Sequence, residues 1–310
     1  MSTAFLHAFG AHLPTRVVTN AEIAARLGRT PDWIENASGI RERRWAASET
    51  SVADLAVAAA EDCLQRAGIE ASALGLVIVA SGSAPPGFPG PAATVVARLG
   101  LEGTPALDLP MASAGALFGL ALASQLTERF GDVLVIGAEK MSAILDAGPL
   151  DPNTAILFGD GAGAALVSSR VGRWRILDAV LHSDGQFRDD LAFDWASPLR
   201  MNGLSVIMHA SRKLPSAIEE VLARQGIAAQ DVTAFLLHQA NQNLLVRVAK
   251  ALKVPPELVF SNVARYGNTS SASMLIAAAE WSRENPASGA VIFSAFGAGF
   301  HWGALLAQSV

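Results

Sequence analysis

Cysteine, charge and basic patches are all scarce in this sequence of 310 residues. A single cysteine, Cys63, excludes an internal disulfide framework, and its place in a helical pattern predicts a small buried group. No group of His, Cys, Asp and Glu has the spacing of metal ligands, so we expect no metal site. The formal net charge of −5 leaves no basic field that would attract nucleic acid or anionic lipid.

Signals for membrane insertion and export are also lacking. The uncharged stretch from Leu109 to Thr127 contains Pro110, Ser113 and further polar residues, which argues against a membrane span. The N-terminal MSTAFLHAFGAHLP has neither the basic start nor the long apolar core of a secretory signal peptide. We therefore expect a cytoplasmic protein whose partners include neither nucleic acid nor a membrane.

Apolar residues, by contrast, make up 51% of the chain, which favours strands buried on both faces. Strand and helix patterns alternate, from a strand at Phe5–Gly10 and a short helix capped by Asn20 to a long helix at Ser51–Ala67. The Gly-rich FGDGAG, Phe158–Gly163, lacks the residues of a phosphate loop and is interpreted as a structural turn. The pattern predicts an α/β protein with at least partly parallel sheets.

The second half of the sequence repeats the first at a shift of 158 residues. RAGIEASALGLVIVASGS from Arg66 falls on RQGIAAQDVTAFLLHQAN from Arg224. GDVLVIGA from Gly131 falls on GAVIFSAF from Gly289 at the same shift. Two independent segments that agree on one shift indicate an internal duplication.

The duplication predicts two similar halves, residues 1–170 and 171–310, and sets Ser113 opposite Ser271. In DLPMASAGALFG a short apolar run stops at Pro110 and an uncharged helical pattern follows. Ser113 is therefore predicted at a helix start, where unpaired backbone N–H groups stabilise an oxyanion. This stretch alone fits either a nucleophile or an ordinary N-cap serine.

Two further polar residues mark strand-to-helix junctions. His238 follows the strand pattern TAFLL, and Asn268 lies in YGNTSSAS before a small-residue helix. An isolated histidine there is more often structural, but together Ser113, His238 and Asn268 could supply a nucleophile, a base and a group that orients or donates. His301, in the glycine-interrupted strand SAFGAGFHWG, could line a pocket or simply hydrogen-bond.

These stretches resemble the β-ketoacyl-acyl-carrier-protein synthase III family of the thiolase superfamily. The matching motifs occur in family order over nearly the whole length: GIRERR, DLPMASAG, FGDGAGA, the MNG at Met201, HQAN, YGNTSSAS and FGAGFHWG. The resemblance implies a five-layered αβαβα fold of two related halves. It also implies a homodimer, or a heterodimer with a related subunit.

In that family an acyl group is loaded from a thioester onto a cysteine. Histidine and asparagine then promote decarboxylation of malonyl carrier protein, whose carbanion attacks the acyl enzyme. By motif, Ser113 occupies the cysteine position, His238 the histidine position and Asn268 the asparagine position. The implied oxyanion donors are the backbone N–H groups of Ser113 and Ala298. The implied substrate-binding residues are Trp33 at the coenzyme A entrance, Phe296 beside the nucleophile, Asn241, Gly203 and His301. No cofactor is implied, since the phosphopantetheine of acyl-CoA or acyl carrier protein belongs to the substrate.

The serine at position 113 departs from the family pattern. A hydroxyl is much harder to ionise than a thiol of pKa about 8.5, so His238 is expected to act as general base. The product would be an oxygen ester, which is less activated toward a carbon nucleophile than a thioester. A natural serine variant and a cysteine replaced to trap a complex both explain the sequence.

Basic positions that grip coenzyme A or the carrier protein in the family read Ala37, Pro152 and Asn243 here. Each lost charge-assisted contact is worth about 1.5–3 kcal/mol, so coenzyme A binding should weaken. Residues that could compensate, or could be ordinary surface charges, are Arg41, Arg43, Arg44, Arg247 and Lys250.

We therefore expect an acyltransferase that moves an acyl group from a carrier-protein or CoA thioester through Ser113 to a malonyl-derived carbanion or another acceptor. Fatty-acid-like or specialised-metabolite biosynthesis is the expected setting. A thioester hydrolase or transacylase, and a non-catalytic partner of a condensing enzyme, are the alternatives.

Overall fold

The computed structural model describes residues 3–146, 151–285 and 288–310. Within these residues the principal strands form one continuous order of nine, β11-β12-β13-β8-β1-β7-β6-β4-β5. β1 meets β8 only through the pairs that Phe5 and Leu6 make, so the order divides there into two sheets joined at one corner.

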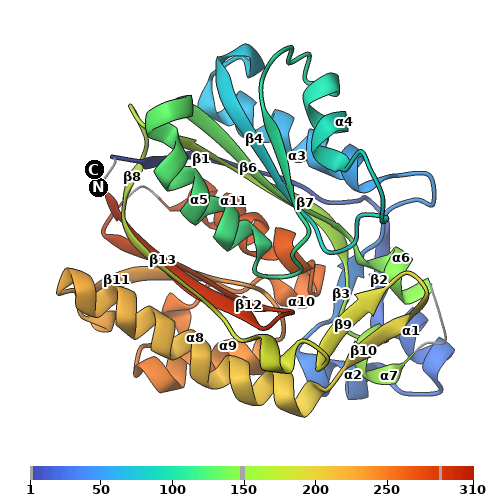
Figure 1. Cartoon of the computed structure of the whole chain (residues 1–310). Coiled ribbons are helices and arrows are strands. Elements are labelled where there is room, and N and C mark those ends of the chain that lie inside the picture. Colours follow the sequence, from blue (N-terminus) through green and yellow to red (C-terminus); the bar gives the residue numbers. More distant parts are fainter. Residues whose placement is uncertain (1–2, 147–150, 286–287) are drawn as a thin grey trace.

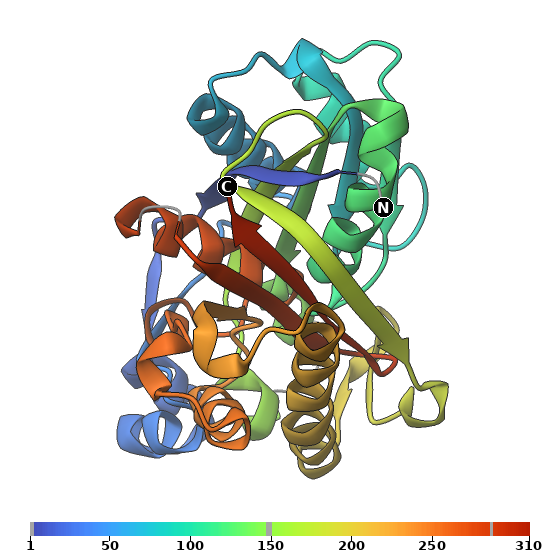
Figure 2. The same cartoon turned by 90° about the vertical axis from the view of Figure 1, so that its left-hand side faces the viewer.

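Each sheet mixes parallel and antiparallel pairs in the same arrangement. The first sheet comprises β5 (Ala106–Leu109), β4 (Leu74–Ala80), β6 (Asp132–Lys140), β7 (Asp160–Ser168) and β1 (Phe5–His12). The second comprises β11 (Val232–Leu237), β12 (Ala290–Gly297), β13 (His301–Ser309) and β8 (Trp174–Ser183). β6 runs parallel to β4, as β12 does to β11, and antiparallel neighbours follow on the other side of each. Figure 2 shows β8 and β13 running side by side, in yellow-green and dark red.

Helices fill three layers around the two sheets (Figure 1). The outer layer on the first sheet holds α3 (Val52–Ala67) and α4 (Pro91–Arg98), the middle layer α5 (Gly115–Phe130) and α11 (Ser273–Glu284), and the outer layer on the second sheet α8 (Gly203–Gln225) and α9 (Gln242–Leu252). The αβαβα arrangement implied by the resemblance is confirmed.

The middle layer explains the apolar composition. α5 and α11 are covered by a sheet on each side, and residues such as Leu117, Leu120 and Leu275 are fully buried. Charged residues are therefore confined to the C-terminal halves of these two helices. Strands such as β6 are buried along their length because helices cover both faces.

The duplication is visible element by element. β11, α11 and β12 each begin 158 residues after β4, α5 and β6, the shift found in the sequence. The segment that enters α5, which carries Ser113, therefore meets the segment that enters α11, which carries Ser270, at the interface of the two halves. The proposed division at residue 170 falls between β7 and β8.

Short elements surround the strand ends where these junctions lie. They are β2 (Val17–Thr19), α1 (Asn20–Leu27), α2 (Pro31–Ser38), β3 (Glu42–Arg44), α6 (Met141–Asp146), α7 (Pro152–Ala155), β9 (Leu191–Asp194), β10 (Ser197–Met201) and α10 (Val263–Tyr266). Among the described residues, no helix has the length and apolarity needed to cross a membrane.

Two local expectations were wrong. The cap of α1 is Thr19, which forms a reciprocal capping box with Glu22, whereas Asn20 is a buried helical residue whose amide donates to Ile40 O. The FGDGAG segment is no turn, because β7 begins within it. A Cβ at Gly163 would lie 2.7 Å from the backbone nitrogen of Ile276, so glycine there lets α11 pack directly on the strand.

Candidate active site

Ser113 lies between β5 and α5 in a strained backbone conformation. Its φ is 61°, in the left-handed region that costs a non-glycine residue about 1–3 kcal/mol and that clusters at functional sites. The N-cap is Ala114 and the helix begins at Gly115, so the reading of Ser113 as an ordinary N-cap is wrong. A Cβ at Gly297 would lie 2.9 Å from the Ser113 Cβ, so glycine lets the end of β12 reach the serine.

His238 follows the last residue of β11 and is buried. Its backbone N–H donates to Ser294 O over 2.9 Å, which holds it beside β12. The ring Nδ1 lies 2.6 Å from the Ser273 hydroxyl at the start of α11. Burial lowers the pKa of His238 to about 4, while a hydrogen bond with the backbone of Ser270 acts in the opposite direction. The imidazole is therefore neutral near pH 7.

Asn268 has one face of its amide group fixed. Its Oδ1 accepts from the Ser270 N–H over 2.8 Å, and its backbone pairs with Leu157 and Gly159 in the segment that leads into β7. The expectation of a strand-to-helix junction at Asn268 was wrong, because the residue lies between α10 and α11. With the oxygen engaged, the Asn268 NH₂ group is the part free to donate into the cavity.

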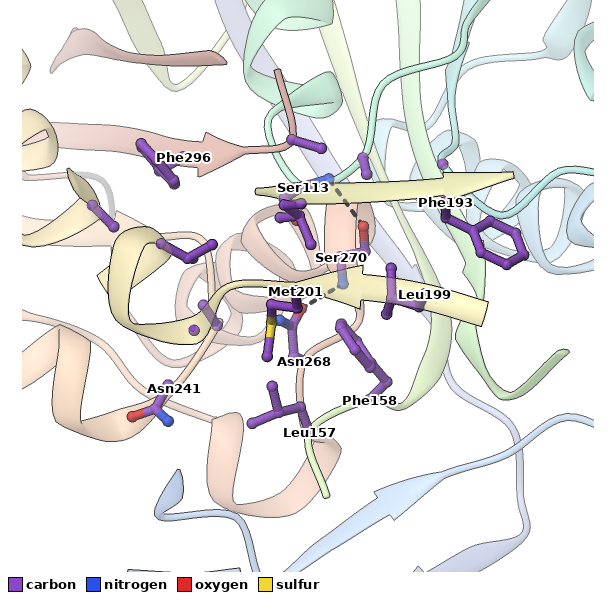
Figure 3. Close-up of a pocket in the computed structure, with 18 of the residues that line it drawn as sticks. Ser113, Leu157, Phe158, Phe193, Leu199, Met201, Asn241, Asn268, Ser270 and Phe296 are labelled. Atoms are coloured by element: carbon purple, nitrogen blue, oxygen red, sulfur yellow. Dashed lines mark hydrogen bonds between the residues drawn. The ribbon is translucent and has the colours of Figure 1, made fainter. Parts of the chain in front are cut away.

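Ser270 connects the asparagine to the serine (Figure 3). Its hydroxyl accepts from the Ser113 N–H over 2.9 Å, and its own φ of 46° is again in the left-handed region. The Ser113 N–H, expected as an oxyanion donor, is thus occupied by a hydroxyl oxygen. The Ala298 N–H, the second expected donor, has no partner among the described residues.

The expected contact between nucleophile and base is absent. No hydrogen bond joins the Ser113 hydroxyl to His238 in the described structure. A base acting on Ser113 would therefore need a change of rotamer, a bridging water or a different group.

One cavity of about 850 Å³ collects every site residue expected from the sequence. The residues in question are Ser113, His238, Asn268, Ala298, Trp33, Asn241, Gly203, Phe296 and His301. Apolar side chains of β9, β10 and the segment before β7 form much of the remaining wall, as Phe158, Phe193, Leu199 and Met201 show in Figure 3. The volume and the largely apolar lining suit a small-molecule ligand with an extended apolar part.

Arg43 is the clearest departure among the basic residues considered from the sequence. Expected near the surface, it is completely buried, and its guanidinium donates to Asn20 Oδ1 over 2.8 Å and to Ile156 O over 2.7 Å. Burial lowers the pKa of Arg43 to about 10, so it stays charged. Its role is to clamp α1 to the segment that enters β7. Arg41, in contrast, is exposed and pairs with Glu35.

Neutral groups contact α2 on the side of Trp33 and Ala37, two residues that line the cavity. The side-chain amides of Asn241 and Asn243 both donate to Ala37 O, over 3.2 and 3.1 Å. The guanidinium of Arg29 stacks over the Trp33 ring, 5.1 Å from its centroid, and brings a cation that sequence reasoning missed. The other basic residues considered lie elsewhere, with Arg44 paired to Glu42 and with Arg247 and Lys250 exposed on α9.

Glu139, at the end of β6, anchors the junction that carries Asn268. This buried carboxylate accepts hydrogen bonds from Ser81, Gly82 and Ser83 of the loop after β4, and from both the N–H and the hydroxyl of Ser271. Sequence reasoning missed Glu139 and the serines. The four hydroxyl residues among the six of NTSSAS were the available signal.

Among the described residues, no group of three or more His, Cys, Asp or Glu could hold a metal ion. Cys63 is buried, and burial raises its pKa to about 12, in keeping with the inert apolar role expected.

Comparison with known proteins identifies close relatives along the whole chain. The sequence profile of the 3-oxoacyl-acyl-carrier-protein synthase III family matches residues 107–185, and the profile of its C-terminal part matches residues 222–309. The β-ketoacyl-acyl-carrier-protein synthase III of Oleidesulfovibrio alaskensis is 36% identical, with 98% of each chain covered.

Solved structures agree. The 3-oxoacyl-acyl-carrier-protein synthase III of Aquifex aeolicus superposes with a TM-score of 0.93 at 33% identity, covering 98% of this chain and 99% of that one. The priming β-ketosynthase of the R1128 polyketide pathway gives a TM-score of 0.90 at 30% identity, covering 99% of this chain and 96% of that one.

Proposed function

The chain belongs to the 3-oxoacyl-acyl-carrier-protein synthase III family of condensing acyltransferases, and we propose that Ser113 carries the acyl group during transfer. The donor is a thioester of acyl carrier protein or coenzyme A, and the acceptor is the carbanion formed from a malonyl thioester. The enzyme is proposed to work in the cytoplasm, as a homodimer or together with a related subunit.

In the first half-reaction the Ser113 oxygen attacks the thioester carbonyl. The C–S bond breaks, the carrier thiol leaves with the proton of the serine, and an oxygen ester remains on Ser113. The start of α5 supplies the partial positive charge that stabilises the tetrahedral oxyanion. The Ala298 N–H is an unengaged donor, and the Ser113 N–H becomes one when it exchanges Ser270 for the carbonyl oxygen.

In the second half-reaction the malonyl thioester loses carbon dioxide. The electrons of the broken C–C bond pass to the thioester oxygen as an enolate, which His238 and Asn268 stabilise as hydrogen-bond donors. The enolate carbon then attacks the ester on Ser113. The serine oxygen leaves and takes up a proton from solvent, which yields a β-ketoacyl thioester and the free enzyme.

The observation that carries this proposal is the convergence of Ser113, His238 and Asn268 on one apolar cavity. Ser113 follows β5, His238 follows β11 and Asn268 lies between α10 and α11. Ser270 joins two of them, since its hydroxyl accepts from the Ser113 N–H and its own N–H donates to Asn268 Oδ1. Such an arrangement fits acyl transfer, whereas a partner that only supports another subunit has no need for it.

Product analysis tests the proposal. The enzyme is incubated with acyl carrier protein bearing acetyl, butyryl or octanoyl groups and with malonyl carrier protein, and products are identified by mass spectrometry. A β-ketoacyl carrier protein that disappears in Ser113→Ala supports condensation. Free fatty acid without the condensed product would identify a thioester hydrolase, and the absence of both products would contradict catalysis by this chain.

A further inference from the structure

The buried Ser273 faces the Nδ1 side of the His238 ring. The Ser273 hydroxyl lies 2.6 Å from His238 Nδ1 and also accepts from the Gln239 N–H over 3.0 Å. Both side chains are buried, with Ser273 2% exposed and His238 5% exposed. Ser273 does not line the cavity, so its contact with the reaction passes through the ring.

The position of the protons in this contact follows from the available partners. A serine hydroxyl has one hydrogen to donate, and one of its lone pairs is taken by Gln239. If Nδ1 carried the ring proton and donated to Ser273, the serine hydrogen would need another acceptor, and the Ser273 hydroxyl makes no hydrogen bond to any other acceptor among the described residues. A buried donor without a partner is costly, which favours the arrangement in which Ser273 donates to an unprotonated Nδ1.

We propose that Ser273 is a positioning residue that keeps the proton of neutral His238 on Nε2, so that the ring meets the extender thioester as a hydrogen-bond donor. The proposal deepens the proposed function and rests on it only for the identity of the carbonyl. The side chain of Asn268 is oriented in a similar way, because the Ser270 N–H donates to its oxygen and leaves its NH₂ group to donate to a ligand. Two backbone-anchored serines thus orient two donors toward one oxygen.

The same tautomer bears on Ser113. A ring with Nε2 protonated and Nδ1 engaged presents no lone pair to the serine hydroxyl. In the resting enzyme His238 is therefore a donor for the second half-reaction and is not the base for the first.

Histidine nitrogen NMR tests the proposal without any turnover. Two-bond ¹H–¹⁵N correlation spectra of the ¹⁵N-labelled protein at pH 7 distinguish the two neutral tautomers, and His238→Gln assigns the signal. The expected result is His238 in the Nε2–H form. Finding the Nδ1–H form in the wild-type protein would overturn the proposal, even if the enzyme condenses as proposed.

Kinetics of three variants supply the second readout. Ser273→Ala should lower kcat for decarboxylation of malonyl carrier protein about ten-fold while changing KM less than about two-fold. The rate of acyl transfer to Ser113 should stay unchanged. Ser273→Thr, which keeps a hydroxyl, should retain the Nε2–H signal and most of kcat, and Ser282→Ala on the same helix is the matched control.

An equal loss of acyl transfer and decarboxylation in Ser273→Ala would show that the serine acts on His238 as a base, and would contradict the proposal. If the wild-type protein lacks all turnover, the proposed function fails while the NMR result still decides the tautomer. The two hypotheses are therefore separable.

Discussion

Protonation of His238 should make the folded protein less stable in mild acid. An unperturbed histidine has a pKa of about 6.5, and burial lowers that of His238 to about 4. Because the folded pKa is the lower one, the unfolded chain binds more protons between these values. The contribution of neutral His238 to the free energy of unfolding is fully present above pH 6.5 and is lost as pH falls toward 4. Linkage gives a loss of about 2 kcal/mol at pH 5 relative to pH 7.

Urea unfolding of the wild-type protein and His238→Gln measures this contribution. All other titrating groups are shared, so the difference between the two proteins at pH 7 and pH 5 isolates His238. We expect the wild-type protein to lose about 2 kcal/mol more than the variant over this interval. Between pH 7.5 and 8.5 the difference in the free energy of unfolding between the two proteins should stay constant, which is the internal control. If the two proteins lose the same free energy of unfolding between pH 7 and pH 5, the reasoning is refuted, because His238 would then have the pKa of an ordinary histidine.

Three further substitutions probe the residues around the site. Glu139→Gln should reduce the free energy of unfolding by about 3 kcal/mol, because the new amide NH₂ would face backbone N–H donors that a carboxylate oxygen accepts from in the wild-type protein. The control substitution at an exposed site, Glu128→Gln, should change it by less than about 0.5 kcal/mol in the same urea titration. Equal effects of the two substitutions would contradict the anchoring role of Glu139. Ser113→Cys should accelerate acyl-enzyme formation at least about ten-fold in rapid-quench mass spectrometry, since a thiolate forms far more readily than an alkoxide; an unchanged or slower rate would contradict nucleophilic attack by this side chain. Arg43→Met should cost about 3 kcal/mol of stability by leaving two buried oxygens without donors, whereas exposed Arg41→Met should cost less than about 1 kcal/mol, and the reverse order in thermal unfolding would argue against the clamp.

Local patterns predicted the elements well. The helix expected at Ser51–Ala67 is α3, which starts one residue later because Ser51 is its N-cap. The 158-residue shift found in two segments is the shift at which β11, α11 and β12 repeat β4, α5 and β6. Such features depend on residues that are neighbours in sequence, or on similarity between two parts of one chain.

Contacts between distant segments could not be predicted in the same way. The Ser113 N–H bonds a hydroxyl 157 residues away, and Arg43 reaches a carbonyl 113 residues away. GIRERR gives no local sign that its middle arginine is buried, because burial there depends on α1 and the entry to β7. The left-handed φ of Ser113 likewise results from packing against Gly297 and Ser270, which the DLPMASAG stretch does not contain.

The role of Ser113 as acyl acceptor is tested most directly by locating the acyl group itself. The protein is incubated with octanoyl carrier protein, quenched in acid and digested, and the peptide spanning residue 113 is sequenced by tandem mass spectrometry. We predict an octanoyl group on Ser113 that is released by hydroxylamine and is absent from Ser113→Ala. An octanoyl group on any other residue, or an adduct that survives Ser113→Ala, would contradict the assignment of this serine as the acyl carrier.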